Sequence, residues 1–318
     1  MTNARRRQTS LLEPSPSEHP AALVSDKEPV YRTPYGAAYA LDCLEFLSAV
    51  PDHSVKAVIT SPPYALHFKK EYGNVDKDDY VRWFLPIAGE IKRVLVEDGS
   101  FVLNIGGSYN PGVPTRSLYH FRLALALCEE VGFYLAQECF WYNPAKLPAP
   151  AEWVNVRRIR VKDSVEYLWW FAPTPWPSAN NRHVLVSYSK DMERLIEKGF
   201  RAKKRPSGHN ITPKFQNNRG GAIPSNLIER GNNESNSSFL KACKERGVKI
   251  HPARFPSTVP EFFIRLVTEV GDLVMDPFAG SNTTGKVAED LDRCWLAIDT
   301  DEDYLRASAL RFGIDLFR

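Results

Sequence analysis

The sequence lacks the features of a secreted, membrane-spanning or zinc-binding chain. Its 318 residues include five cysteines, none of them in a CxxC or CxxH pair, so neither a disulfide framework nor a zinc site is expected. It contains no run of about 18 apolar residues, and its N-terminal segment has no apolar stretch of the kind that a secretory signal needs. We therefore expect a cytoplasmic protein with reduced thiols, no membrane span and no metal.

The glycine motifs that bind nucleotide phosphates are also missing. Neither GxGxxG nor GxxxxGK[ST] occurs in the chain, which argues against a dinucleotide site and a P-loop. The composition is otherwise that of an ordinary globular protein, with 43% apolar and 25% charged residues. A chain of this length can form one large domain or two small ones.

Charge is distributed unevenly along the chain. Residues 141–255 hold 21 of the 41 Lys and Arg residues but only 9 of the 38 Asp and Glu residues. A basic middle third between acidic flanks suggests a segment that faces a polyanion such as nucleic acid. On charge alone, a solvated surface insert is an equal alternative.

Hydrophobic periodicity predicts alternating strands and helices on both sides of an irregular middle segment. The expected helices cover residues 43–50, 79–95, 119–131, 260–270, 283–291 and 302–312, and the expected strands residues 55–59, 100–105, 136–141, 273–275 and 295–298. Such alternation is typical of an α/β fold with a parallel sheet covered on both faces. Residues 1–29 lack periodicity and are expected to be a disordered tail.

Two short motifs follow predicted strands, which is where ligands bind in open α/β sheets. The first, residues 276–285 (DPFAGSNTTG), joins small residues to the start of a helix, whose amides favour a carboxylate or another anion. One strand later comes Asp299, and an acidic residue at that place suits the two hydroxyls of a ribose. A tight turn with a helix cap is an equally good explanation of this motif taken alone.

The second motif is TSPPY, residues 60–64. Two prolines after a buried strand keep the backbone extended. The Ser61 hydroxyl and the Pro62 carbonyl would then face outward as fixed acceptors beside the Tyr64 ring. Two acceptors and an aromatic face match a planar base with an exocyclic amino group. A rigid turn with a packed tyrosine is the alternative.

Together these residues resemble the amino-methyltransferase family of DNA-modifying enzymes, whose signatures are [DNS]PP[YFW] for the target amine and DxFxG for the cofactor. The segment before TSPPY and residues 251–256 (HPARFP) extend the resemblance, which covers residues 30–318. The catalytic loop precedes the cofactor loop, which is the circularly permuted order of the beta class. In particular, the chain resembles the PvuII-type cytosine-N4 enzymes of restriction–modification systems. The family's cofactor loop often has a second glycine where Ala279 or Asn282 stands here.

The resemblance implies a Rossmann-like methyltransferase fold that uses S-adenosylmethionine: a mostly parallel twisted sheet with helices on both faces, circularly permuted, with an inserted target-recognition region. It implies a catalytic half over residues 30–143, DNA target recognition over residues 144–250 and a cofactor half over residues 251–318. The expected partner is double-stranded DNA, bound by a monomeric, DNA-associated bacterial protein.

The resemblance also assigns roles to single residues. The implied catalytic residues are Ser61, Pro62, Pro63 and Tyr64. The implied cofactor-binding residues are Asp42, Phe255, Asp276, Pro277, Phe278, Gly280, Ser281, Asn282, Thr283, Thr284 and Asp299. The basic clusters expected to contact DNA phosphates are Arg157, Arg158, Arg160 and Lys162, and Arg201, Lys203, Lys204 and Arg205.

The implied reaction transfers a methyl group to the N4 amino group of a flipped cytosine. The Ser61 hydroxyl and the Pro62 carbonyl would stabilise the charge that develops on the nitrogen. No cysteine nucleophile is needed, and the chain has no Pro-Cys dipeptide of the kind that carbon-5 cytosine methyltransferases use. Three alternatives remain open: adenine-N6 as the target, an RNA or a protein glutamine as the substrate, and a non-catalytic DNA-binding protein of the same fold.

Overall fold

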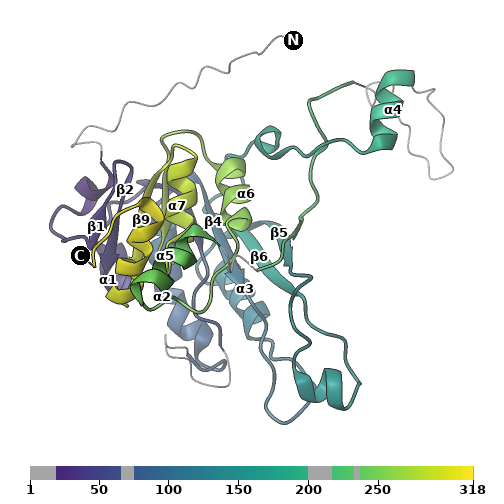
Figure 1. Cartoon of the computed structure of the whole chain (residues 1–318), viewed down its shortest axis with the longest axis horizontal. Coiled ribbons are helices and arrows are strands. Elements are labelled where there is room, and N and C mark those ends of the chain that lie inside the picture. Colours follow the sequence, from purple (N-terminus) through teal and green to yellow (C-terminus); the bar gives the residue numbers. More distant parts are fainter. Residues whose placement is uncertain (1–18, 66–74, 200–216, 233–236, 318) are drawn as a thin grey trace.

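Nine strands form one mostly parallel sheet within the residues that the computed structural model describes, 19–65, 75–199, 217–232 and 237–317 (Figure 1). The strand order is β1-β2-β9-β8-β3-β4-β6-β5-β7. The strands are β1 (Tyr31–Arg32), β2 (Gly36–Ala40), β3 (Val55–Thr60), β4 (Leu95–Ile105), β5 (Tyr134–Tyr142), β6 (Val165–Ala172), β7 (Leu227–Glu229), β8 (Leu273–Asp276) and β9 (Cys294–Asp299). Only the β1–β2, β4–β6 and β5–β6 pairs of these described strands are antiparallel. The predicted sheet is confirmed.

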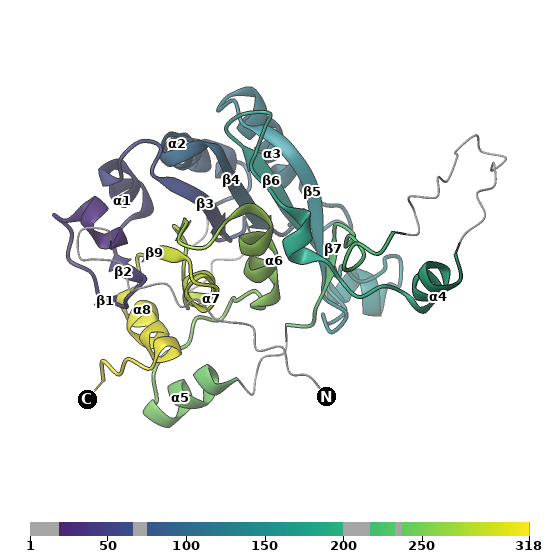
Figure 2. The same cartoon turned by 90° about the horizontal axis from the view of Figure 1, so that it is seen from above.

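Helices cover both faces of the sheet, as Figure 2 shows. One face carries α1 (Cys43–Ala49), α2 (Tyr80–Val94) and α3 (Tyr119–Glu129); the other carries α6 (Thr258–Val267), α7 (Thr283–Asp290) and α8 (Glu302–Ser308), which continues into the 3₁₀ helix η5 (Ala309–Phe312). Each face has its own apolar core, with Phe46, Phe84 and Leu123 buried on the first and Phe263 and Leu305 on the second. The apolar periodicity of these segments is what directs one side of each helix to the sheet.

The predicted disordered tail, residues 1–29, extends too far. Residues 1–18 lie outside the described part of the chain, but Pro20–Val24 form the 3₁₀ helix η1, in which Ala21 and Val24 are buried. The prediction also missed β1 and β2, since small residues such as those of β2 give a weak strand pattern. A Cβ at Gly36 would lie 2.2 Å from the Trp295 ring, so only glycine lets β2 pass beside that side chain.

The predicted recognition region, residues 144–250, is not one insert. Its residues Val165–Ala172 form β6, an interior strand of the sheet that lies between β4 and β5. Leu168, Trp169 and Phe171 are buried. Because both faces of this strand are covered, it shows a continuous apolar run, which lacks the alternation that marks a half-buried strand. The boundary at residue 143 therefore falls inside a hairpin of the sheet domain.

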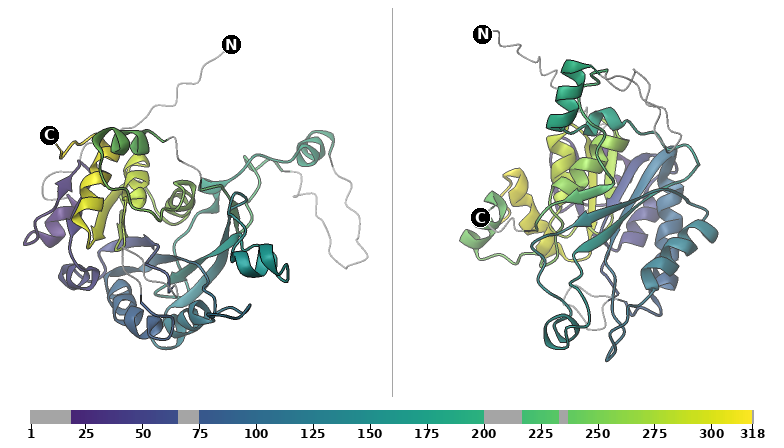
Figure 3. Two further views of the ribbon diagram at one scale, coloured as in Figure 1. Left: turned by 60° about the horizontal axis from the view of Figure 1, so that its bottom comes forward. Right: turned by 90° about the vertical axis from the view of Figure 1, so that its right-hand side faces the viewer.

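The same region also contains segments that leave the sheet, as Figures 1 and 3 show. The β5–β6 loop, residues 143–164, holds the short π-helix η2 (Glu152–Val156), and the chain after β6 holds η3 (Asn181–Val184) and α4 (Lys190–Lys198). None of these three helices has a buried residue. In contrast, α5 (Ser238–Arg246) packs against the C-terminal helices through Phe239 and Cys243. No helix in the described ranges is long and apolar enough to cross a membrane.

Candidate active site

The sheet places the two motif loops next to each other. β3 pairs with β8 in parallel, with Ala57 opposite Val274 and Val58 opposite Met275. Parallel neighbours end at the same edge of the sheet, so the TSPPY loop after β3 and the DPFAGSN loop after β8 leave the sheet side by side. The two loops are about 200 residues apart in the sequence, and the pairing of β3 with β8 brings them together.

A cavity of about 520 Å³ lies at this edge, a size typical of small-molecule sites. The predicted site residues that line it are Asp42, Ser61, Pro62, Pro63, Tyr64, Phe255, Pro277, Phe278, Gly280, Ser281, Thr283 and Asp299. The catalytic loop and the cofactor loop thus line the same cavity. Asp42 also caps α1, because its Oδ1 accepts from the backbone N–H groups of Leu44 and Glu45.

Three predicted cofactor residues, Asp276, Asn282 and Thr284, do not line this cavity. Asp276 is buried beneath the loop and accepts from Thr60 Oγ1 at 2.6 Å, Thr284 Oγ1 at 2.7 Å and the Phe278 backbone N–H at 3.1 Å. Burial raises the pKa of Asp276 to about 6. Asp276 therefore holds the end of β3 and the start of α7 together through Thr60 and Thr284.

Asn282 has a similar supporting role. It adopts the left-handed conformation (φ +48°, ψ +50°), which asparagine tolerates better than most residues. Its Oδ1 caps α7 by accepting from the Gly285 N–H at 3.0 Å, and its Nδ2 donates to Tyr31 Oη at 2.9 Å. The side chain thus fixes the turn from β8 into α7.

Gly280 in the cofactor loop is hydrogen-bonded to Asp299 at the end of β9. Gly280 has φ +51°, and a Cβ there would lie 3.1 Å from the His251 ring, so both conformation and space favour glycine. Its N–H donates to Asp299 Oδ2 at 2.7 Å, and the Asp301 N–H donates to Oδ1 at 3.0 Å. Burial raises the pKa of Asp299 and lowers the pKa of His251. Each carboxylate oxygen has a second lone pair, which leaves acceptor capacity for two ribose hydroxyls.

Hydrogen bonds and ring packing hold the catalytic loop in place. Tyr80 Oη donates to the Pro63 carbonyl at 2.8 Å. The Tyr64 ring packs directly on Gly106 at the end of β4, where a Cβ would lie 2.5 Å from Cε2 of the ring. Tyr64 Oη lies 2.7 Å from Glu166 Oε2 and 3.1 Å from Asn104 Oδ1. The loop therefore presents rigid groups to the cavity.

Sequence reasoning missed several residues of the cavity wall. They include Trp83, Asn104, Trp141 and Glu166, whereas His251 and Arg254, which also line the wall, belong to the HPARFP segment of the resemblance. Asn104 could have been predicted from the sequence, because it stands two residues before the Gly-Gly that ends a predicted strand. Glu166 was not, because its strand lay in the segment interpreted as irregular.

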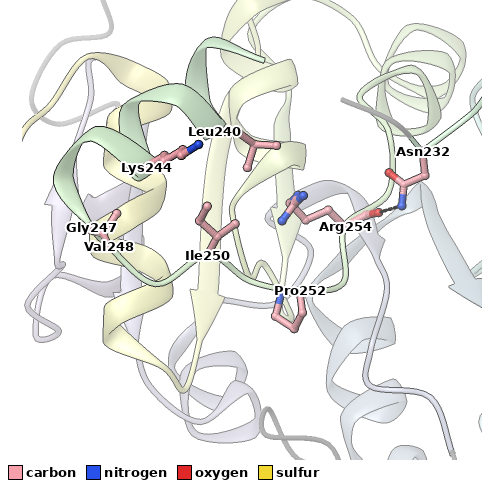
Figure 4. Close-up of a pocket in the computed structure, with 8 residues that line it drawn as sticks. All are labelled: Asn232, Leu240, Lys244, Gly247, Val248, Ile250, Pro252 and Arg254. Carbon is pink, nitrogen blue, oxygen red and sulfur yellow. Dashed lines mark hydrogen bonds between the residues drawn. The ribbon is translucent and has the colours of Figure 1, made fainter. Parts of the chain in front are cut away.

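A second hollow, of about 750 Å³, adjoins the cavity between α5 and the segment before α6 (Figure 4). Asn232 and Arg254 line both spaces, and Asn232 Nδ2 donates to the Arg254 carbonyl at 2.7 Å. These shared residues place the hollow directly beside the predicted cofactor-binding wall.

The first predicted DNA-contacting cluster lies on the β5–β6 loop. Arg157 and Arg158 are exposed, and Arg157 forms an ion pair with Glu152 at 2.8 Å. Arg160 is half-buried, and its Nη2 lies 3.7 Å from Asp163 Oδ1. Lys162 is exposed, and its Nζ donates to the Pro144 carbonyl at 3.1 Å. The second cluster, Arg201, Lys203, Lys204 and Arg205, lies outside the described residues. Among the described residues, no group of three or more His, Cys, Asp or Glu side chains can hold a metal ion.

Comparisons with known proteins found matches that cover most of this chain. A family model described as DNA methylase matches residues 55–310. The type II methyltransferase M.PvuII of Proteus hauseri is 51% identical over 289 residues, which cover 90% of this chain and 86% of that protein. The type II methyltransferase M.ScaI of Streptomyces caespitosus is 27% identical over 87% of this chain and 81% of that protein.

Solved structures show the same architecture. The PvuII DNA methyltransferase, described as cytosine-N4-specific, superposes with a TM-score of 0.74 and 45% sequence identity, and the match covers 91% of this chain and 90% of that chain. The M1.HpyAVI complex with SAM superposes with a TM-score of 0.53 at 19% identity, over 88% of this chain and 100% of that one. At this identity the second likeness concerns the fold alone.

Proposed function

This chain belongs to the DNA methylase family, and from that premise we propose that it transfers a methyl group from S-adenosylmethionine to the N4 amino group of cytosine in duplex DNA. The observation that carries the proposal is the meeting of the TSPPY loop and the DPFAGSN loop in one cavity. The relative with 51% identity is named a type II methyltransferase, and the structure with 45% identity is described as cytosine-N4-specific.

The cofactor, whose methyl group is bound to a positively charged sulfur, fits the groups on the cofactor side of the cavity. Asp299 would accept from its ribose hydroxyls, and Phe278 offers an aromatic surface, with its ring centroid 5.9 Å from that of Trp83. The start of α7, with Ser281 and Thr283 on the wall, would take the carboxylate of its amino-acid end. Phe255 and Asp42 close the same space.

The catalytic loop would act on the target amine by electrostatic stabilisation. The N4 lone pair of cytosine is delocalised into the ring, so the nitrogen must become more tetrahedral and more positive as it is methylated. Ser61 Oγ and the Pro62 carbonyl would accept its two N–H bonds and favour that change. A base inside a duplex cannot reach this cavity, so the proposal includes flipping of the cytosine and its stacking on Tyr64.

The biological part of the proposal is modification within a restriction–modification system. The protein would act in the cytoplasm on a short duplex target, as a monomer, since the strands of a duplex can be methylated one at a time. Double-stranded DNA is the partner that the basic residues on the β5–β6 loop would contact.

The DNA-facing role of this loop has its own test. Replacing Arg157, Arg158 and Arg160 together by Glu should weaken DNA binding roughly 1,000-fold at low salt and flatten its salt dependence. Fluorescence anisotropy with labelled duplex over a series of salt concentrations would measure both. Wild-type affinity in this variant would place the DNA on another face.

The decisive test of the reaction is mass spectrometry of nucleosides from unmethylated duplex DNA incubated with protein and S-adenosylmethionine. We expect N4-methylcytosine. N6-methyladenine would keep the enzyme class and refute the base. Neither product, on mixed-sequence DNA long enough to contain any short site, would refute a DNA substrate and favour RNA or protein.

A further inference from the structure

A hydrogen-bonded chain links the catalytic loop to a charged pair elsewhere in the sheet domain. Ser61 Oγ lies 3.4 Å from Tyr64 Oη, which lies 2.7 Å from Glu166 Oε2. Glu166 Oε1 accepts from Lys146 Nζ at 2.9 Å. Glu166 lies on β6 and Lys146 on the β5–β6 loop, so two segments distant from TSPPY in the sequence complete this chain.

The chemistry of its members fixes the direction of the chain. An ionised carboxylate only accepts, so Tyr64 must donate to Glu166. Asn104 Oδ1, 3.1 Å away, attracts the same proton, and its Nδ2 donates to the Tyr167 carbonyl. Burial and the Glu166 charge raise the pKa of Tyr64 well above its ordinary value, which keeps the hydroxyl protonated. The Tyr64 oxygen is then free to accept the single hydroxyl proton of Ser61.

This direction matters for Ser61. Once its only proton points to Tyr64, Ser61 Oγ presents lone pairs to the cavity. An amino group brings N–H donors, for which lone pairs are the complementary partner. If the Tyr64 hydroxyl turned round and donated to Ser61, the Ser61 proton would be free to point into the cavity and oppose the amine.

We propose that Glu166 is a positioning residue of the methyl-transfer site, which acts through Tyr64 to hold Ser61 as a hydrogen-bond acceptor for the target amine. Lys146 holds the carboxylate in place from its other oxygen. This inference rests on the proposed function, because it assumes an amine as the target. It adds a residue outside the SPPY loop to the groups that determine the rate.

The test compares the steady-state kinetics of Glu166→Leu, Tyr64→Phe and the double variant with those of the wild type, on duplex DNA. Leucine removes the acceptor, and phenylalanine removes the middle hydroxyl while keeping the ring. We expect kcat to fall roughly 10- to 100-fold in each single variant, with KM for DNA changed by less than about 3-fold. The double variant should be no slower than the slower single variant, since both changes break one chain.

Wild-type kcat in Glu166→Leu, or a loss in the double variant equal to the product of the single losses, would overturn the inference. Glu138→Gln, which alters an exposed carboxylate on the neighbouring strand β5, is the matched control and should keep wild-type kinetics. Cofactor affinity and thermal unfolding, measured on every variant, separate a positioning effect from a loss of fold. A wild type that binds cofactor but methylates no DNA base would instead remove the proposed function, and this inference with it.

Discussion

The two loops that meet in the cavity are built in opposite ways. In the cofactor loop, the polar side chains of Asp276, Asn282 and Thr284 point into the protein and hold the turn. In the catalytic loop, two prolines fix the backbone, and the side chains of Ser61 and Tyr64 line the cavity. The cofactor loop thus uses buried polar side chains to shape its turn, whereas the catalytic loop is shaped by its prolines and keeps its polar side chains at the cavity.

This difference has a physical reason. A cofactor with a charged amino-acid end is bound well by backbone N–H groups at a helix start, which need a turn held tightly from within. A reacting amine needs acceptors that do not move while charge develops. Substitutions in the two loops should therefore change different quantities, and the following predictions separate them.

The largest effect is expected at Tyr64. Tyr64→Ala removes the ring on which the flipped base would stack and the hydroxyl that orients Ser61, so kcat should fall roughly 100-fold or more. Cofactor affinity, measured by isothermal titration calorimetry, should stay at the wild-type level. Unchanged turnover would remove the stacking role from the catalytic loop.

A smaller effect of the opposite kind is expected at Asp299. Asp299→Ala removes the acceptor for the ribose hydroxyls and releases the Gly280 N–H, so the Kd for the cofactor should rise roughly 10- to 100-fold. DNA affinity, measured by anisotropy in the absence of cofactor, should change little. If DNA affinity fell and cofactor affinity did not, the two functions would have been assigned to the wrong loops.

The smallest effect on binding is expected at Asp276, where the change should appear in stability. Burial raises the pKa of Asp276 from 3.8 to about 6. Between these two pH values, the native state keeps a proton on Asp276 that the unfolded chain has lost. The contribution of this group to stability is therefore full at acidic pH and is lost as the pH rises from about 4 to about 6.

Asp276→Asn cannot exchange that proton. Across the same pH range, the free energy of unfolding of the wild type should fall relative to that of the variant, by up to about 3 kcal/mol. Urea unfolding at several pH values measures this difference. A difference in the free energy of unfolding that stays constant over this pH range would mean that Asp276 does not titrate there. A large loss of cofactor affinity in Asp276→Asn would mean that Asp276 contributes to cofactor binding.

The sequence predicted most of the sheet domain, because strong periodicity marks elements such as α2 and β3. It also predicted which loops form the cavity, because ligand sites follow strands. It did not predict β6, whose continuous apolar run hides a strand covered on both faces. Glu166 was missed with that strand, although it reaches the hydroxyl of a predicted catalytic residue.

The sequence by itself determined the kind of chemistry, since TSPPY and DPFAGSN carry their residue types and backbone restrictions wherever they are placed. The tertiary structure decided which polar residues of these motifs line the cavity and which support the turn. Asp276 and Asp299 both end a strand, yet one is sealed beneath the loop and the other lines the cavity. That choice depends on what packs above each strand end, because burial and hydrogen-bond partners come from segments far away in the sequence.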